Sequence, residues 1–398
     1  MSHTPVTPAR VLPTLVMAQF AGTSLWFAVN AVMPELQQAY GWSAASVGSL
    51  TNALQLGFIV GTLVFALLAV ADRFSTRRIF LLCALAGAAC TLGARAQASD
   101  IQALMAWRAA TGFFLAGIYP VGMKIAAQWF PQRMGSALGL LVGALVLGSA
   151  SPHALRAMGS ALPWDFVMVA VAALAAVGGV GLFMALPEAP RPAQSTAGPA
   201  AFQWRALSVI WTARRVRASA LGYFGHMWEL YTLWVLMPLI LATRLEGATL
   251  SWAAFVVLGS GVVGCVGGGW LATRWGSARV AFVQLATSGL CGLLAPWLLD
   301  ASTPVFALWL LVWGITVSGD SPQFSALTAS NAPAHQVGSV LTLVNSLGFA
   351  LSMVSIALFV HATTTLSLAT VLPWLSVGPA LGLWSLRPLM RPGPATSP

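Results

Sequence analysis

Uncharged apolar runs of about twenty residues or more recur along the whole of this 398-residue chain. A helix of that length spans the hydrocarbon core of a bilayer, which is about 30 Å thick. In lipid a spanning segment must satisfy its own backbone hydrogen bonds, and a helix does so within one segment. Charged residues make up 7% of the chain, against roughly 25% in soluble domains. The sequence therefore predicts an all-α polytopic membrane protein.

The apolar runs divide into twelve predicted spans, on either side of a polar, proline-rich segment. The first six are predicted at 11–33, 45–70, 78–96, 101–128, 135–156 and 163–186. The last six are predicted at 218–242, 249–272, 278–299, 302–329, 336–361 and 365–387. Three units follow: an N-terminal six-helix bundle (1–187), a cytoplasmic linker (188–217) and a C-terminal six-helix bundle (218–398).

Within the linker region, residues 187–201 have the composition of a flexible chain. Residues 203–217 place Trp204, Leu207 and Trp211 on one face, followed by three arginines. This pattern predicts a short helix that lies on the membrane surface.

Arginine positions predict the orientation, because cytoplasmic loops of membrane proteins are enriched in Lys and Arg. With the N-terminus inside, the outer loops hold only Arg95, Arg156 and Arg244. The inner segments hold Arg10, Arg73, Arg77, Arg78, Arg133, Arg191, Arg205, Arg214, Arg215, Arg217, Arg274, Arg279, Arg387 and Arg391. We therefore expect a plasma (inner) membrane protein with both termini in the cytoplasm. The formal net charge of +10 then reflects topology and attraction to anionic lipid, and no nucleic acid partner is expected.

The two halves of the chain are copies. The proline-broken stretch Trp107–Ser136 returns about two hundred residues later as Trp313–Ser339, with Pro120 matching Pro322. The first span, Phe20–Pro34, likewise aligns with Phe224–Pro238 in the seventh. Repeats of this kind underlie transporter folds whose binding site lies near the bilayer midplane, between the halves.

The loops after spans 2 and 8 carry a charged motif in both copies. The chain resembles the major facilitator superfamily, whose motif there reads Gly-x-x-x-Asp-Arg-x-Gly-Arg-Arg. Leu68 and Ser75 stand where that family has glycines. The matching residues, interpreted as a gating motif, are Asp72, Arg73, Arg77, Arg78 and Arg274. The resemblance implies two six-helix bundles that transport a solute by alternating access.

Two basic residues lie inside predicted span 4. Arg108 begins an Arg-x-x-x-Gly pattern with Gly112, which resembles a family motif whose arginine is implied in proton coupling. A buried guanidinium needs a partner or a water-filled cavity, unless it snorkels toward the outer surface. Lys124 is nearer the cytoplasmic end, where it either binds an anion, serves in gating, or reaches the headgroups.

Two acidic residues lie inside predicted spans of the second half. Glu229 is ten or more residues from either end of span 7 and shares a helix face with His226. Such a carboxyl must face a cavity, pair with a cation, or be protonated. Asp320 precedes the Pro322 break of span 10, a plausible ion or substrate site. Because the cations lie in the first half and the acids in the second, pairing between the halves is also expected.

Weaker candidates are polar residues that could line a cavity, although each is more often a packing hydrogen bond. They are Asn30, Asn52, Gln55, Tyr119, Tyr223, Tyr231, Gln323 and Asn345. Small-residue pairs, Gly57/Gly61, Gly139/Gly143 and Gly264/Gly268, predict close-packed faces on spans 2, 5 and 8, which meet across the halves in the resembled fold.

We expect a proton-coupled transporter that moves a small solute, with a proton gradient as its driving force and no cofactor. The buried cations favour an organic anion taken up by symport. The alternatives are a proton-driven efflux antiporter of drugs or metabolites, for which a partial glycine-proline pattern at Gly148–Pro152 speaks, and a transporter-like receptor. No enzyme or metal site is apparent, and we expect a monomer that binds a small molecule within the bilayer.

Overall fold

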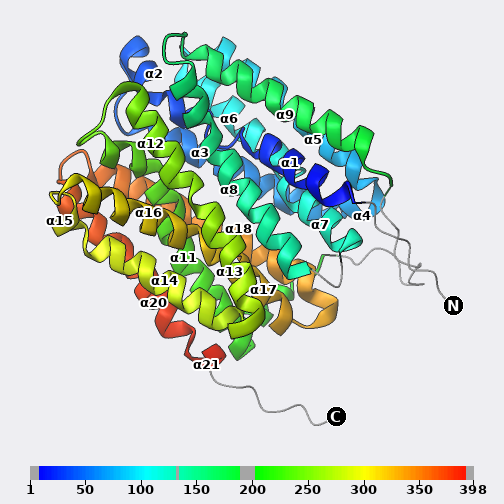
Figure 1. Cartoon of the computed structure of the whole chain (residues 1–398). Helices are drawn as coiled ribbons and strands as arrows, with labels where there is room; N and C mark the ends of the chain where they lie inside the picture. The colour runs from blue at the N-terminus through cyan, green and yellow to red at the C-terminus, as the bar shows by residue number, and fades with distance from the viewer. Residues whose placement is uncertain (1–8, 131–133, 189–201, 391–398) are drawn as a thin grey trace.

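The computed structural model describes residues 9–130, 134–188 and 202–390, and these form helices joined by short turns (Figure 1). The predicted loop at 131–133 and most of the predicted flexible segment 187–201 lie outside the described residues, as do Arg133, Arg191 and Arg391. Within the described part there is no β-strand. The all-α prediction is confirmed.

The first half contains the following helices: α1 (Val11–Thr23), η1 (Asn30–Val32), α2 (Met33–Tyr40), α3 (Ser46–Leu67), α4 (Val70–Arg73), α5 (Thr76–Ala96), α6 (Ile101–Leu115), α7 (Tyr119–Trp129), α8 (Met134–Met158) and α9 (Asp165–Ala185). The second half contains α10 (Ala206–Thr212), α11 (Arg214–Leu241), α12 (Gly247–Gly259), α13 (Gly261–Trp275), α14 (Ser277–Leu293), α15 (Ala295–Leu298), α16 (Thr303–Gly319), α17 (Ser321–Asn331), η3 (Ala334–Gln336), α18 (Val337–Ala362), α19 (Leu368–Val371), η4 (Leu372–Ser376), α20 (Val377–Ser385) and α21 (Arg387–Met390).

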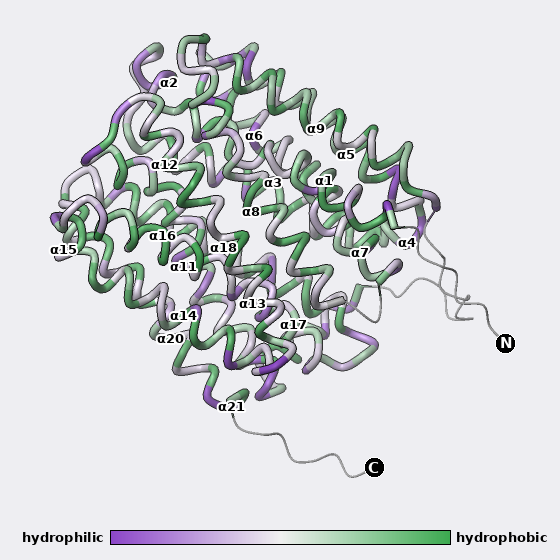
Figure 2. Tube along the Cα trace, in the orientation of Figure 1, coloured by the Kyte–Doolittle hydropathy of each residue, from purple (hydrophilic) through white to green (hydrophobic). Residues whose placement is uncertain are grey.

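These helices form two bundles that lie side by side, and long apolar stretches run along both (Figures 1 and 2). Among the described residues, ten helical segments are long and apolar enough to cross a membrane. The two remaining predicted spans are interrupted: the first is divided into α1, η1 and α2, and the ninth into α14 and α15. The arrangement agrees with twelve spans in two groups of six.

The prolines of spans 4 and 10 break both helices where the sequence predicted. Helix α6 ends at Leu115 and α7 begins at Tyr119, with Pro120 in its first turn. Helix α16 ends at Gly319 and α17 begins at Ser321, with Pro322 in its first turn. Proline is tolerated in a first turn because its missing N–H has no helical partner there.

The first span departs from its repeat partner. Residues 24–29 form turns rather than helix, whereas α11 is continuous from Arg214 to Leu241 and includes Pro238. Near the interruption the Thr23 and Ser24 hydroxyls donate to the backbone carbonyls of Gln19 and Ala21, at 2.8 and 2.7 Å. Such local bonds compete with the regular ladder. The sequence alignment of the two spans did not predict this difference.

The predicted membrane-surface helix is shorter than expected. Helix α10 covers Ala206–Thr212, and Arg214, Arg215 and Arg217 already belong to α11. Ala206 and Ile210 are buried against the bundle, while Trp204, Leu207 and Trp211 are exposed. The apolar face foreseen from the sequence therefore points away from the protein.

Only one of the three glycine pairs faces the other half. Gly139 and Gly143 approach Cys265 and Val262 of the second half. Gly57 instead contacts α6: a Cβ there would lie 1.8 Å from the Ala109 carbonyl oxygen. The pair Gly264/Gly268 packs within its own half as well. The three spans do meet the other half, α3 on α18 and α8 on α13, as the resemblance implied. Spans 2 and 8, however, use these glycines for contacts inside their own bundles.

The two ends of the molecule differ in how the halves meet. We call the end with α4, α7 and α21 the linker end (Figure 1). At the opposite end α3 packs on α18: the Ser352 hydroxyl donates to Gln55 Oε1 at 2.8 Å, and the Asn52 amide donates to the Met353 carbonyl at 3.0 Å. A cavity lies at the linker end, between α8 and the helices α13, α14 and α17. The halves are therefore closed at the opposite end.

Candidate functional site

Arg108 is buried, with 1% of its surface exposed, and its guanidinium supports the interruption of the first span. It donates to the backbone carbonyls of Leu25, at 3.0 Å, and Trp26. Turn carbonyls inside an apolar bundle need donors from elsewhere. Arg108 supplies them, so the alternative that it snorkels to the surface does not describe this structure.

Lys124 lies at the linker end and forms an ion pair there. Its Nζ is 2.5 Å from Asp72 Oδ1 of the sequence motif, and both side chains are partly exposed. Arg77, from the same motif, pairs with Glu188 at 2.7 Å and donates to the Leu186 carbonyl at 2.9 Å. These contacts tie α4 and α5 to α7 and to the segment after α9, all within the first half.

The remaining motif arginines are exposed at the linker end. Arg73 and Arg78 lie on its surface. The Arg274 guanidinium stacks over the ring of Trp270, 4.2 Å from its centroid, within α13. The motif residues thus surround the linker end of both halves.

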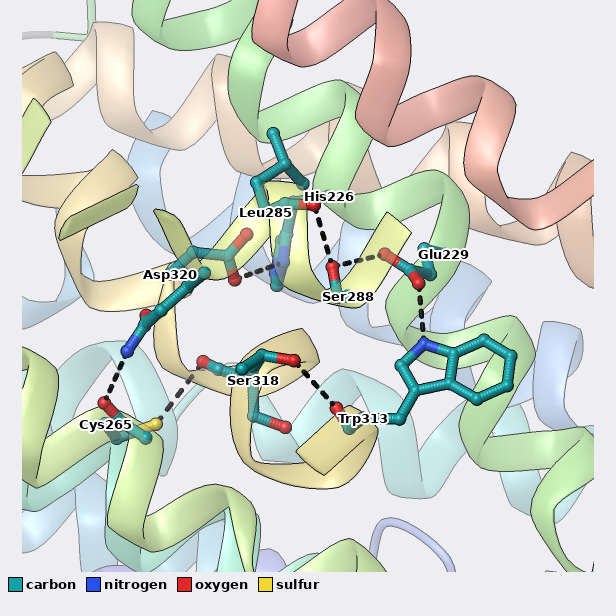
Figure 3. A network of polar contacts seen from close by, with 11 residues as sticks. His226, Glu229, Cys265, Leu285, Ser288, Trp313, Ser318 and Asp320 are labelled. Atoms are coloured by element: carbon teal, nitrogen blue, oxygen red, sulfur yellow. Dashed lines mark hydrogen bonds and ion pairs between the residues drawn. The ribbon is translucent and has the colours of Figure 1, made fainter. Parts of the chain in front are cut away.

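Glu229 is fully buried in the second half and accepts two hydrogen bonds (Figure 3). Ser288 of α14 donates to Oε2 at 2.8 Å, and Trp313 Nε1 of α16 donates to Oε1 at 2.7 Å. Hydrogen bonds to an ionised carboxylate are stronger than neutral ones. The Ser288 hydroxyl also lies 3.2 Å from the Leu285 carbonyl, so it has a second acceptor.

Asp320 and His226 form a second buried contact in the same half. Nδ1 of His226 lies 2.8 Å from Oδ1 of Asp320, and both side chains are excluded from the surface. Asp320 lies between α16 and α17, at the proline break. Figure 3 shows Asp320 and Glu229 on either side of His226 and Ser288. Both acids are therefore associated with span 10: Glu229 is bonded to Trp313 of that span, and Asp320 is part of it.

The charged residues inside the spans do not pair across the halves in this structure. Arg108 and Lys124 are bonded within the first half, and Glu229 and Asp320 within the second. The expected pairing of cations with acids between the halves is absent here.

A central cavity lies between the halves, lined by α7, α8, α11, α16, α17 and α18. Three of the sequence candidates, Tyr119, Tyr223 and Tyr231, line it together with Asn345. About 30 Å³ is open there to the centres of water molecules, against about 310 Å³ in the linker-end cavity. Gln323 lines the linker-end cavity instead.

Aromatic side chains close the central cavity toward the opposite end. Trp26 stacks on Tyr231 with ring centroids 5.8 Å apart, and on Phe349 at 5.7 Å. Phe27 packs on Trp234 at 5.4 Å. We call Trp26, Phe27, Phe58, Tyr231, Trp234 and Phe349 the aromatic cluster. Because it joins residues of both halves, the cluster blocks passage between the cavity and the opposite end.

The other polar candidates brace this closure. The Asn30 amide donates to the Thr51 hydroxyl at 2.8 Å and so links the interrupted first span to α3. Asn52 and Gln55 make the bonds between α3 and α18 given above. They are structural contacts in this conformation, as the sequence analysis allowed for each of them.

Sequence reasoning missed the donors to Glu229 and, except for Tyr231, the aromatic cluster. Trp313 opens the repeated stretch, and Ser288 is a polar residue inside an apolar span. Both donors, Trp313 and Ser288, could have been found by asking which hydrogen-bond donors a buried carboxylate requires. Among the described residues no group of three or more His, Cys, Asp and Glu could hold a metal ion.

Two repeated helical bundles around a central cavity, with charges buried inside the spans, define a polytopic membrane protein of the transporter class. The chain belongs to the Major Facilitator Superfamily, whose family model matches residues 15–383. The resemblance seen in the loop motifs and the repeat is therefore confirmed.

Two relatives share part of the sequence. A chloramphenicol resistance protein of Streptomyces lividans is 28% identical over 256 residues, which cover 64% of this chain and 63% of that protein. The chain thus spans less than two thirds of that relative. The 4-hydroxybenzoate transporter PcaK of Pseudomonas putida is 24% identical over 356 residues, or 77% of this chain and 75% of that protein.

Solved structures share the fold. The human organic anion transporter MFSD10 (TETRAN) superposes with a TM-score of 0.74 at 16% identity, over 95% of this chain and 99% of that one. The nucleoside transporter NupG superposes with a TM-score of 0.71 at 14% identity, over 96% and 100%. At these identities the likeness concerns the fold alone.

Proposed function

We propose that the protein is a proton-coupled secondary transporter of a small organic solute, working by alternating access in the plasma membrane with its linker end in the cytoplasm. The observation that carries the proposal is the pair of fully buried carboxyl groups, Glu229 and Asp320, in the half that forms most of the central cavity wall. Ionisable groups inside a membrane span are costly and mark ion or proton pathways.

The hydrogen bonds of Glu229 support a role in binding and releasing a proton. Trp313 N–H can only donate, so it suits either form of the carboxyl through one oxygen. Ser288 can donate to Glu229 or to the Leu285 carbonyl. When Glu229 takes up a proton, the Ser288 hydroxyl can turn to Leu285 and accept from the new O–H. Protonation then changes a contact between α11 and α14 without leaving a polar group unpaired.

The opposing ends support alternating access. The aromatic cluster and the α3–α18 bonds close the opposite end, while the larger cavity lies at the linker end. Transport requires these contacts to separate in another state. In this proposal the motif residues Asp72, Arg73, Arg77, Arg78 and Arg274 gate the linker end, with Lys124 as the partner of Asp72. Arg108 acts by holding the first span in place.

The direction of transport has two candidates. Symport is the first. The sequence favoured an organic anion because Arg108 and Lys124 could bind it, but both side chains form bonds away from the cavity, so they do not support an anionic substrate here. Proton-driven export is the second, supported by the chloramphenicol resistance relative. Both use the same acids.

Purified protein in liposomes with an imposed pH gradient tests the proposal. A panel of aromatic acids, amides and antibiotics is screened for proton movement with an internal pH dye. Solute accumulated with inward protons indicates symport, and solute exchanged for protons indicates export. Glu229→Gln and Asp320→Asn should each abolish the coupling, while Asp165→Asn, at the surface beside Arg95, should not. Gradient-driven transport that survives in both core variants would overturn the assignment, and solute binding without any flux would indicate a receptor.

A further inference from the structure

The wall of the central cavity contains no ionised side chain. It is aromatic at Tyr119, Tyr223, Tyr231, Trp234 and Phe349, and its other members are aliphatic, serine or asparagine. The charged groups of the spans all make their contacts elsewhere. An anionic ligand in this cavity would lose its hydration without meeting a countercharge, because Arg108 and Lys124 are bonded elsewhere, and this is unfavourable in a low-dielectric interior.

Helix α11 explains how an acidic span gives a neutral wall. Tyr223, Met227, Leu230 and Trp234 recur every three or four residues and line the cavity together. Glu229 lies outside this series and faces α14 and α16, where Ser288 and Trp313 bond it. Glu229 is therefore behind the wall, and the side chains that α11 presents to a ligand are not charged.

Several polar atoms of the wall have no partner. Trp234 is 2% exposed, and its Nε1 is buried without a hydrogen-bond acceptor among the described residues. Ser318, another residue of the wall, is 1% exposed, and its Oγ likewise has no hydrogen-bond partner among the described residues. Tyr223 and Tyr231 are also buried side chains of this wall. An unpaired buried donor is costly. The wall thus offers a tryptophan N–H, tyrosine hydroxyls and the Asn345 amide to a ligand with complementary polar groups.

The rings around these atoms favour a flat ligand. Tyr231 and Phe349 lie 5.2 Å apart between centroids, and Tyr231 and Trp234 lie 5.9 Å apart. Aromatic faces pack well on other rings at such distances. The space now open to water centres, about 30 Å³, holds only about two water molecules. A ring is therefore admitted only as the halves separate toward the linker-end cavity.

We propose that the central cavity binds an uncharged aromatic molecule that carries a hydrogen-bond acceptor, with its ring among Tyr231, Trp234 and Phe349 and its acceptor on Trp234 Nε1. The inference rests on the proposed function in taking this cavity as the place where the transported solute binds. It replaces the organic anion of the sequence analysis with a neutral class of substrate.

The test compares two molecules of nearly the same shape. 4-Hydroxybenzamide is neutral, and 4-hydroxybenzoate is an anion at pH 7. Binding of each to the full-length protein in nanodiscs is measured by saturation-transfer NMR, with empty nanodiscs as background. The amide should bind at least tenfold more tightly than the benzoate. It should also bind more tightly than 4-hydroxycyclohexanecarboxamide, which lacks the ring. Equal binding of the acid or of the saturated amide would overturn the proposal.

Variants locate the site. Trp234→Phe keeps a ring but removes the N–H, and should weaken the amide about fivefold, the effect of losing one ordinary hydrogen bond. Trp374→Phe, at a side chain that is 64% exposed, is the matched control and should not change it. If Trp234→Phe fails to fold, Tyr223→Phe tests the same wall. Unchanged binding in the cavity variant that folds would refute the assignment.

The proposed function can fail separately. The protein in liposomes could transport some other solute in a Glu229-dependent way, while the neutral aromatic amide neither binds nor competes. That result would refute the proposed substrate class and would still support proton-coupled transport. Amide binding that depends on Trp234, with no gradient-driven flux of any solute, would support the binding site and refute proton-coupled transport.

Discussion

Replacing Arg108 with methionine should open the end of the molecule that is now closed. The guanidinium donates to the Leu25 and Trp26 carbonyls, and Trp26 is the residue that stacks on Tyr231 and Phe349 of the other half. Methionine keeps an unbranched apolar side chain, shorter than that of arginine, and has no donor. The turn at residues 24–29 then loses its support, and the Trp26 ring loses its fixed position.

The magnitude follows from two terms. The two carbonyls left unpaired together cost about 2–6 kcal/mol, and removing a buried charge recovers about 3 kcal/mol. At mid-range the protein is therefore destabilised by only about 1 kcal/mol. The closure is affected more, because two aromatic contacts at about 0.5–1.5 kcal/mol each contribute only while Trp26 is held. Their loss removes about 2 kcal/mol, which multiplies the open-to-closed ratio by roughly thirty.

The assay is a spin-label distance measurement across the opposite end. Labels at Tyr40 and Leu366 are exposed there, one in each half. Arg108→Met should add a population at longer distance, and Arg108→Lys, which keeps a donor, should add less. Arg95→Met is the control, because Arg95 pairs with Asp165 near the surface of its own half. A distance distribution for Arg108→Met that matches the unmodified protein would refute the reasoning.

Three further outcomes are expected. Ser352→Ala removes the buried bond to α3 and should favour opening by about 0.5–1.5 kcal/mol, seen as a smaller shift with the same two labels; no shift would mean that the bond does not hold the halves. Gly112→Ala should lower the melting temperature strongly, because a Cβ there would lie 1.9 Å from a backbone oxygen of α3, whereas Gly267→Ala, with open space around it, should not. Exchanging Asp72 and Lys124 should change the stability by less than about 1 kcal/mol, since the pair is exposed. Each single charge reversal, Asp72→Lys or Lys124→Asp, should nevertheless slow transport more than the exchanged pair does. Equal transport rates in the two single variants and the exchanged pair would exclude a gating role.

The helices were predictable because their signal is local. Lipid forces an apolar run to be a helix, and proline marks where it breaks, so Pro120 and Pro322 placed the interruptions of spans 4 and 10 correctly. The acids Glu229 and Asp320 were found for the same reason, since a charge inside a span is visible without knowing its neighbours.

What could not be predicted depends on contacts between distant segments. The Asp72 partner of Lys124 is 52 residues away, and the donors to Glu229 come from α14 and α16. The interruption of the first span depends on Arg108 of α6, whereas its repeat partner α11 has no such break. The spacing of residues along the chain does not reveal any of these pairings. For the same reason the sequence led us to expect cation–acid pairs across the halves, which the structure does not contain.

The first span is interrupted and the seventh is continuous, so the two halves should also differ in how easily these spans bend. Around residues 24–32 the backbone lacks a continuous helical ladder, so this stretch can bend as a hinge, while α11 is one continuous helix from Arg214 to Leu241. Amide hydrogens should accordingly exchange with solvent deuterium sooner in the former than in the latter. Although the two halves are copies, we expect them not to share the conformational change equally: the first span can bend at its interruption, and the continuous seventh span has no matching break.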